Sequence, residues 1–196
     1  TRDKSLMGTP FERRPQTTGK RIAVIGAGPA GLTAALDLVR LGHQVSVFEA
    51  LSVAGGMMRV GIPPHRLPIE LLDWEIQQIL DEGVDLHLDK RIDDVPGLLE
   101  IGYDAVLIAT GAHQAKKLSV RHSNHPDNWL SLDFLRRTAL GEPIDLSGKK
   151  ILVLGGGNVA LDTARTAIRL GKPEVRMACL ESRGEMPGFA WEVKVA

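Results

Sequence analysis

The chain has 196 residues, enough for one large domain or two small ones, and its 24 lysines and arginines balance 24 aspartates and glutamates. This zero net charge, with 43% hydrophobic residues, is typical of a folded globular protein and gives no sign of a nucleic-acid-binding surface or of disorder. No uncharged apolar stretch reaches the roughly 20 residues that cross a bilayer, so we expect no membrane span and a cytoplasmic location.

The first half of the chain predicts alternating strands and helices after a polar segment. Residues 1–19 contain prolines and glycines and are expected to form an extended arm. Apolar residues at strand spacing and at helical spacing then predict a strand at 21–25, a helix at 29–41, a strand at 44–48, a helix ending at Gly83, and strands at 84–88 and 104–109. The first three of these elements form a βαβ unit.

The second half predicts a further βαβ unit. Residues 112–128 are polar and rich in histidine, and we expect a crossover loop without a metal site because no compact ligand spacing is completed. A helix is expected at about 131–140, with Ser131 as its N-cap. The second βαβ unit is expected as a strand at 150–154, a helix at 158–170 and a strand at 175–180.

A glycine-rich turn joins the first strand to the first helix. Gly26, Gly28 and Gly31 form a GxGxxG pattern, which allows a tight turn, the approach of a pyrophosphate and close helix–strand packing. The free N–H groups and the dipole at the helix start attract phosphates. Glu49, at the end of the next strand, is placed to accept hydrogen bonds from a ribose. The alternative is a turn that only packs tightly, beside a solvated glutamate.

The second βαβ unit has the same arrangement. Gly155, Gly157 and Ala160 form the GxGxxA variant, and Glu181 follows the next strand. A carboxylate there binds a free ribose 2′-hydroxyl and repels a 2′-phosphate, which favours NAD over NADP. Arg183 lies two residues further on and could reverse this preference. The alternative is a βαβ repeat that has lost its ligand.

Four motifs occur in an order that is specific to one family. They are Ile25-Gly-Ala-Gly-Pro-Ala-Gly-Leu32, Gly55-Gly-Met-Met-Arg-Val-Gly-Ile-Pro63 with the following Arg66-Leu-Pro68, Ala109-Thr-Gly111, and Leu154-Gly-Gly-Gly-Asn-Val-Ala-Leu-Asp162. With them the chain resembles the glutamate synthase small subunit-like flavoproteins, which have two dinucleotide-binding domains and include the reductase portion of dihydropyrimidine dehydrogenase. The resemblance implies an α/β fold of two Rossmann-like units: after the arm at 1–19, an FAD-type unit at 20–120 and an NAD(P)-type unit at 121–196.

The resemblance also assigns cofactor roles. Glu49 would bind the adenosine ribose of FAD, Arg66 would contact the cofactor and Ile92 would lie near the adenine. The FAD set is Gly26, Gly28, Pro29, Ala30, Gly31, Glu49, Ala50, Gly55, Gly56, Met57, Arg66, Ile92, Ala109, Thr110 and Gly111. The NAD(P)H set is Gly155, Gly157, Asn158, Val159, Ala160, Glu181, Ser182 and Arg183. No catalytic acid or base is expected, because hydride passes directly between nicotinamide and flavin.

Three departures from the family pattern sharpen the prediction. NADPH-using relatives carry two basic residues where this chain has Glu181 and Ser182, which again favours NAD. Many relatives carry a cysteine-rich iron–sulfur domain before the first glycine turn, where this chain has only the arm at 1–19. The absence of a cysteine pair after Gly55 and Gly56 separates the chain from disulfide reductases, and the single Cys179 cannot hold an iron–sulfur cluster, so the expected electron-exchange partner is an iron–sulfur protein or subunit. The family's return segment over the flavin is missing, so we expect a C-terminally incomplete enzyme, either a truncation or a split subunit.

The predicted function is therefore that of an FAD-dependent NAD(P)H oxidoreductase subunit or fragment that exchanges electrons with an iron–sulfur partner. NAD(H) is favoured over NADP(H). A non-catalytic nucleotide-binding scaffold subunit of a larger redox complex is the alternative. A flavin oxidase or monooxygenase is disfavoured by the second glycine turn.

Overall fold

The computed structural model describes residues 17–171 and 174–195, so most of the expected N-terminal arm lies outside the described residues. Contacts divide the chain into two compact units. The first unit consists of Thr1–Gly55 and Asp73–Thr110, and the second consists of Gly56–Leu72 and Gly111–Ala196. The segment Gly56–Leu72, which the sequence analysis includes in the FAD-type unit, thus makes its contacts with the second unit.

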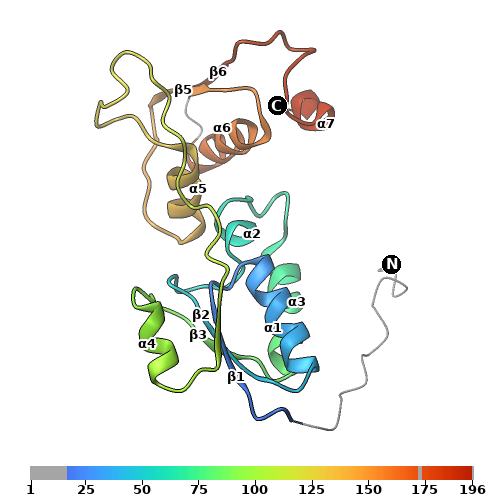
Figure 1. The fold of residues 1–196 in the computed structure, drawn as a ribbon. Coiled ribbons are helices and arrows are strands. Elements are labelled where there is room, and N and C mark those ends of the chain that lie inside the picture. The colour runs from blue at the N-terminus through green and yellow to red at the C-terminus, as the bar shows by residue number, and fades with distance from the viewer. Residues whose placement is uncertain (1–16, 172–173, 196) are drawn as a thin grey trace, which may run out of the picture. The chain divides into compact units, whose positions relative to one another are not determined.

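The first unit is built on a parallel sheet of four strands in the order β3-β2-β1-β4 (Figure 1). Its strands are β1 (Arg21–Ile25), β2 (Gln44–Phe48), β3 (Asp85–His87) and β4 (Ala105–Ile108). Its helices are α1 (Pro29–Arg40), α4 (Val95–Glu100) and the greater part of α3 (Ile69–Asp81). Because all four strands are parallel, the segments that follow them emerge at the same edge of the sheet.

Side-chain alternation gives this sheet a core on each face. On one face, Ala23 and Ile25 of β1 pack against Leu98 of α4. On the other face, Val24 and Val47, which are paired in register, have no exposed surface. Burial on both faces explains why β1 is a continuous apolar run in the sequence.

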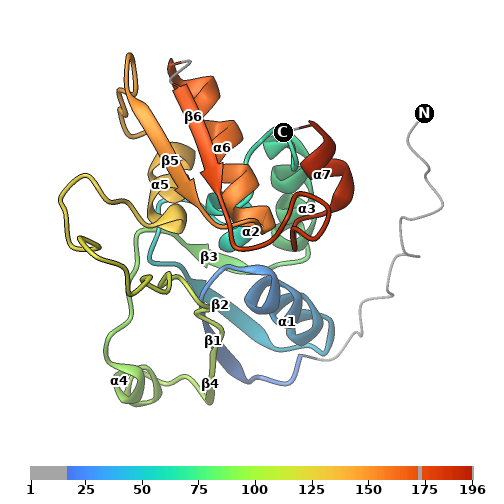
Figure 2. The same ribbon diagram turned by 90° about the horizontal axis from the view of Figure 1, so that it is seen from above.

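The second unit contains a two-stranded parallel sheet, in which β5 (Lys150–Leu154) pairs with β6 (Glu174–Ala178). Its helices are α2 (Met57–Val60), α5 (Ser131–Ala139), α6 (Asn158–Gly171) and α7 (Ala190–Val195). Helix α6 connects the two strands and lies beside them, with α5 next to it (Figure 2). Ala160 and Ala164 of α6 pack against Val153, and Ala167 packs against Phe134 of α5.

The predicted α/β elements are confirmed, with local differences. The strands at 21–25, 44–48 and 150–154 have the predicted bounds, and residues 112–128 form neither helix nor strand. The strands predicted at 84–88 and 104–109 are each one residue shorter at both ends, and the strand predicted at 175–180 begins one residue earlier and ends two residues earlier.

The remaining differences concern the helices: α1 and α5 end one residue earlier than predicted and α6 ends one residue later. The prediction of Ser131 as an N-cap is wrong, because the cap is Leu130, which makes no side-chain capping bond. The sequence analysis does not anticipate α2 or α4. Helix α4 begins just before Pro96 and Gly97, a pair that ordinarily indicates a turn, but proline is tolerated in the first turn of a helix.

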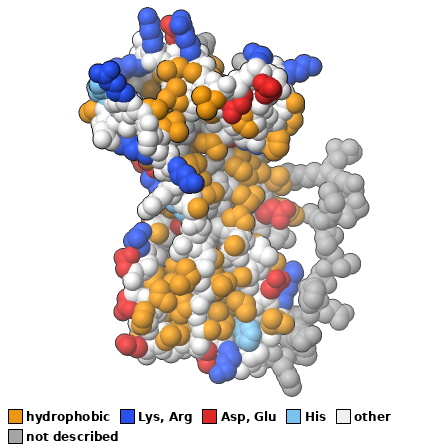
Figure 3. Space-filling model, turned by 45° about the horizontal axis from the view of Figure 1, so that its top comes forward, with side chains coloured by type: hydrophobic (Ala, Val, Ile, Leu, Met, Phe, Trp, Pro, Cys, Tyr) orange, Lys and Arg blue, Asp and Glu red, His pale blue; other side chains and the backbone are white. Residues whose placement is uncertain are grey.

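Large apolar side chains are exposed on both units (Figure 3). In the first unit, the edge strand β4 exposes Leu107 and Ile108, the latter by 62%. In the second unit, Leu152 and Leu154 of β5 are exposed. No helix within the described part of the chain has both the length and the apolarity that a membrane crossing needs.

Asp94 is expected to stabilise α4 as its N-cap, because its Oδ1 accepts the N–H of Gly97 at 3.0 Å. Asp94→Ala should lower the free energy of unfolding by about 1 kcal/mol, measured by urea denaturation. Asp93→Ala is the matched control, since Asp93 makes an exposed ion pair with Arg91 and does not cap a helix. Equal losses in the two variants would contradict the capping role.

Candidate functional site

The first glycine turn lies at the end of β1, where two of its glycines have no room for a side chain. Gly26 has a φ of +108° and donates its N–H to the carbonyl of Phe48 at 2.8 Å. A Cβ on Gly26 would lie 2.4 Å from the carbonyl oxygen of Ala109, and one on Gly31 would lie 1.9 Å from the carbonyl oxygen of Gly26. Both glycines are therefore required by the tight turn and by the close packing of α1, as the pattern predicts.

The start of α1 leaves its first N–H groups without a side-chain acceptor. Gly28 is the N-cap, with extended backbone angles, and no side chain caps the helix. Pro29 follows and has no N–H. Unpaired N–H groups at a helix N-terminus form an anion-binding position, so this turn fits the pyrophosphate of a dinucleotide.

Glu49 is bonded into the same turn. Its side chain is only 7% exposed, with Oε2 accepting the N–H of Ala27 at 2.8 Å and Oε1 accepting the N–H of Leu51 at 2.9 Å. The alternative of a solvated glutamate is therefore wrong. Each carboxylate oxygen accepts more than one hydrogen bond, so Glu49 can hold the turn and still accept from a ribose hydroxyl.

The other residues of the predicted FAD set are divided between the two units. Ala109 donates its N–H to the carbonyl of Ile25 at 2.8 Å, which places it at the same sheet edge as Gly26. Gly55 donates to the carbonyl of Ala27, also at 2.8 Å, and Ile92 packs against the core on the α4 face. Exposed members in the first unit are Pro29, Ala30, Ala50 and Thr110. Members in the second unit are Gly56, Met57, Arg66 and Gly111.

The second glycine turn, after β5, leaves open space beside its backbone. Gly155 has a φ of +126° and donates its N–H to the carbonyl of Ala178 at 2.8 Å. Apart from its chain neighbours, no atom of the described residues lies within 4 Å of where a Cβ on Gly157 would be. Glycine at this position is thus not explained by packing within the described residues, and the space suits a phosphate group.

A segment that the sequence analysis did not assign packs against the second turn. Gly188 donates its N–H to the carbonyl of Gly156 at 3.0 Å, and the Asn158 side chain accepts the N–H of Phe189 at 2.8 Å. A Cβ on Gly188 would lie 2.5 Å from Leu161. The only sequence signal for this contact is the glycine after Pro187. Within the predicted set, Ala160 is buried and Val159 is exposed.

The acidic position after β6 is exposed. Glu181 has no ion-pair partner among the described residues, and its neighbour Ser182 is hydrogen-bonded to Glu185 at 2.6 Å. Arg183 donates to the carbonyl of Val193 at 3.1 Å. The one cation near Glu181 in sequence is therefore bonded to the end of α7.

Four charged side chains of the second unit form an ionic cluster, which consists of Arg66, Asp162, Arg165 and Glu192. Arg66 Nη1 lies 2.5 Å from Asp162 Oδ2, and Arg66 Nε lies 3.1 Å from Glu192 Oε1. Glu192 Oε2 is also hydrogen-bonded to Arg165. Asp162 is 3% exposed and Glu192 is fully buried, so neither is a solvated surface carboxylate.

Burial governs the electrostatics of this cluster. It raises the pKa of Asp162, while the bond from Arg66 acts in the opposite direction. Beside the cluster, partial burial lowers the pKa of His65, and the guanidiniums of Arg169 and Arg165 lower it further. The cluster itself contains two guanidiniums and two carboxylates, so its charges balance.

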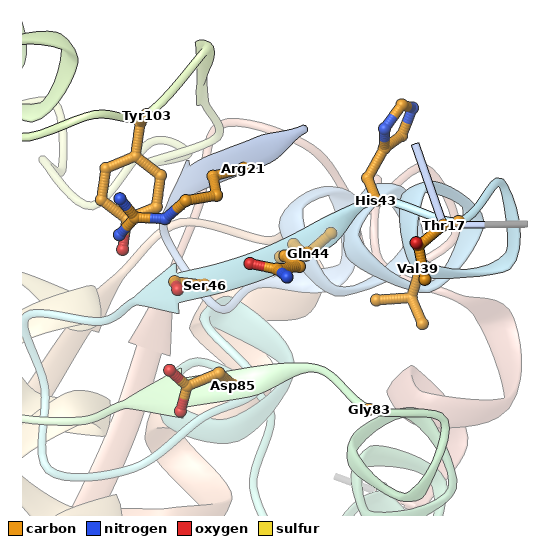
Figure 4. Close-up of a pocket in the computed structure, with 11 residues that line it drawn as sticks. Thr17, Arg21, Val39, His43, Gln44, Ser46, Gly83, Asp85 and Tyr103 are labelled. Atoms are coloured by element: carbon orange, nitrogen blue, oxygen red, sulfur yellow. The ribbon is translucent and has the colours of Figure 1, made fainter. Parts of the chain in front are cut away.

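A hollow of about 670 Å³ lies away from the glycine turns, where the strands of the first sheet begin (Figure 4). Arg21, Gln44 and Asp85, at the starts of β1, β2 and β3, line it together with Tyr103. The Arg21 guanidinium lies 4.6 Å from the centre of the Tyr103 ring. None of the predicted site residues lines this hollow.

A metal-binding cluster is not found among residues 17–171 and 174–195. A metal site would need at least three side chains of histidine, cysteine, aspartate or glutamate close together, and these residues contain no such group.

The model of the pyridine nucleotide-disulphide oxidoreductase family matches residues 20–190. The chain is 46% identical to the NADP(+)-dependent formate dehydrogenase subunit beta of Moorella thermoacetica, over 92% of this chain and 26% of that protein. It is 34% identical to a putative glutamate synthase [NADPH] small chain of Cereibacter sphaeroides, over 95% and 46%. It is 36% identical to the NAD-dependent dihydropyrimidine dehydrogenase subunit PreT of Salmonella typhimurium, over 90% and 43%.

The structure of Mycobacterium tuberculosis FprA in complex with NADPH has the same fold, with a TM-score of 0.75 and 22% identity over 90% of this chain and 47% of that chain. The resemblance predicted from the four motifs is confirmed, because a glutamate synthase small chain and a dihydropyrimidine dehydrogenase subunit are both among the relatives. The chain spans between about a quarter and a half of the length of these relatives.

Gly26→Ala is expected to disrupt the first turn, because the new methyl group would overlap the carbonyl oxygen of Ala109. The variant should unfold at a markedly lower temperature than the parent protein, measured by circular dichroism. Gly19→Ala is the matched control: Gly19 also has a positive φ, of +72°, but among the described residues no atom beyond its chain neighbours lies within 4 Å of its Cβ position. A similar loss in both variants would mean that backbone strain alone accounts for the effect.

Proposed function

Because the chain belongs to the pyridine nucleotide-disulphide oxidoreductase family, we propose that it is an FAD-dependent NAD(P)H oxidoreductase subunit or fragment. The observation that carries this proposal is the pair of strand–glycine turn–helix cradles, one in each unit. In the first, the buried Glu49 is bonded to the turn, and in the second, the space beside Gly157 is open. The carboxylate suits a ribose hydroxyl of a dinucleotide, and the open space suits its pyrophosphate.

The residues have separate roles in this proposal. The turn from Gly26 to Gly31 holds the pyrophosphate of FAD, Glu49 binds its ribose, and Arg66 contacts the cofactor. The turn from Gly155 to Ala160 holds the pyrophosphate of NAD(P)H. FAD, when bound, accepts a hydride from the nicotinamide and releases electrons one at a time. The contribution of the protein is to position the two cofactors and to exclude water.

The proposed electron-exchange partner is an iron–sulfur protein or subunit. Two relatives are named as subunits of larger redox enzymes, a formate dehydrogenase and a dihydropyrimidine dehydrogenase. Cys179 is the only cysteine of the chain, so its own residues supply neither a dithiol nor the cysteine ligands of a cluster. Electrons that leave a flavin here need an acceptor outside these residues.

The proposal predicts a flavin absorption band that is bleached by NADH or NADPH under anaerobic conditions. Gly28→Val is the informative variant: the extended backbone of Gly28 suits valine, whereas the side chain would obstruct the pyrophosphate, so flavin retention should be lost. The affinity for the nicotinamide nucleotide should change much less. A protein that remains colourless after FAD is added would contradict the proposal and favour a scaffold subunit.

We further propose that NAD(H) is preferred over NADP(H), because the Glu181 carboxylate is exposed after β6 and Arg183 is bonded to Val193. The relative with 46% identity is named NADP(+)-dependent, so a direct comparison of NADH with NADPH is the decisive test of this preference. In the bleaching assay, the half-saturating concentration of NADPH should exceed that of NADH by about tenfold or more. Glu181→Ala should reduce this ratio, and Glu174→Ala, at the other end of β6, should leave it unchanged. A clear advantage of NADPH in the parent protein would overturn this assignment of Glu181.

A further inference from the structure

The β6–α7 loop, residues 179–189, is hydrogen-bonded at both of its ends to the second glycine turn. Just before the loop, the carbonyl of Ala178 accepts the N–H of Gly155 at 2.8 Å. Near its end, Gly188 donates its N–H to the carbonyl of Gly156 at 3.0 Å. The loop is therefore closed onto the turn, as in the compact surface loops whose ends lie close together.

Asn158 supplies a side-chain bond to the same end of the loop. It is the first residue of α6, and its Oδ1 accepts the N–H of Phe189 at 2.8 Å. The Phe189 side chain is 54% exposed, so burial of its ring contributes little to holding the loop in place. The hydrogen bond from a defined acceptor thus determines where the loop ends and α7 begins.

Hydrogen bonds inside the loop connect this end to the acidic position after β6. Ser182 Oγ donates to Glu185 Oε2 at 2.6 Å, and the Glu185 N–H donates to the carbonyl of Ser182 at 2.9 Å. The Cys179 thiol donates to the carbonyl of Glu181, with 3.4 Å between sulfur and oxygen. Because these bonds stiffen the loop, a shift at its end would also displace Glu181.

The Glu181 carboxylate can distinguish the two nucleotides only from a defined position. It has to accept a hydrogen bond from the ribose 2′-hydroxyl of NAD, and such a bond weakens steeply as its geometry departs from the ideal. Glu181 is exposed and has no ion-pair partner among the described residues, so no neighbouring charge holds its side chain. Its position is set by the backbone of the loop.

We propose that Asn158 is a positioning residue, which holds the β6–α7 loop on the second glycine turn so that Glu181 meets the ribose 2′ position of NAD(H). This inference rests on the proposed function and on the proposed preference for NAD(H). Asn158 acts on that preference through Glu181. Its effect on the preference should therefore disappear when the Glu181 carboxylate is removed.

A double-mutant cycle tests this dependence. The variants are Asn158→Ala, Glu181→Ala and the two combined. The measured quantities are the dissociation constants of NAD⁺ and NADP⁺, obtained by isothermal titration calorimetry, which requires no turnover. Asn158→Ala should lower the ratio of the NADP⁺ constant to the NAD⁺ constant about fivefold, the factor expected for one hydrogen bond. In the Glu181→Ala background the same change should leave the ratio unaltered.

Two further variants separate positioning from damage to the turn. Asn158→Asp keeps an oxygen that accepts the N–H of Phe189, and its added charge affects a pyrophosphate that both nucleotides share, so the ratio should equal that of the parent protein. Thr163→Ala is the control on the same helix, because Thr163 Oγ1 donates to the carbonyl of Val159 within α6. This variant should also keep the parent ratio.

The ratio of the two constants decides the outcome. If Asn158→Ala does not fold, as measured by circular dichroism, Phe189→Pro takes its place, since it removes the same bond at the donor and should show the same dependence on Glu181. An unchanged ratio, an equal fall with and without Glu181, or a fall in Asn158→Asp would overturn the positioning role while the proposed function stands. Tighter binding of NADP⁺ by the parent protein would overturn the assignment of Glu181 and this inference with it. A parent protein that binds neither nucleotide would overturn the proposed function as well.

Discussion

The first unit depends on how closely its backbone segments approach at Gly26. Parallel pairing of β1 with β2 and β4 brings the end of β1 against Ala109, so closely that a methyl group on Gly26 would overlap a carbonyl oxygen. The backbone of the turn is therefore restricted to one conformation, in which the N–H of Ala27 donates a hydrogen bond to the Glu49 carboxylate just after β2. One steric constraint thus brings a glycine turn, a helix N-terminus and a carboxylate to a single edge of the sheet.

The second unit relies on charge pairing where the first relies on close packing. Within the described part of the chain its sheet has two strands, and much of its apolar surface is exposed. Arg66, from the segment before α3, joins α6 and α7 through Asp162 and Glu192. Such a cluster adds less stability than an apolar core of the same size would, but it specifies orientation, since each carboxylate must meet a particular nitrogen. The charge cluster thus fixes the orientation of its side chains in a unit whose apolar core is small.

Most of the fold could be predicted from the sequence because its signals are local. Strands such as β1 and β5 are apolar runs ending at glycines, and the pattern of each glycine turn is contained within a short stretch of chain. The ionic cluster could not be predicted in this way: Arg66 and Asp162 are 96 positions apart, and nothing in either segment indicates that the other is its partner. The burial of Glu192 could not be predicted from the sequence either, because a single glutamate in a short helix ordinarily faces solvent. Helix α4 was missed for a different reason, since Pro96 and Gly97 outweigh the cap at Asp94 when only propensity is considered.

The edge strand β4 has a consequence for handling the protein. It pairs with β1 along one side, and among the described residues no strand covers its other side, where backbone N–H and C=O groups lie beside the exposed Leu107 and Ile108. An apolar edge of this kind is a template for strand pairing between molecules. A charged side chain on such an edge disfavours this pairing, so Ile108→Lys would make β4 a poorer template for association between molecules.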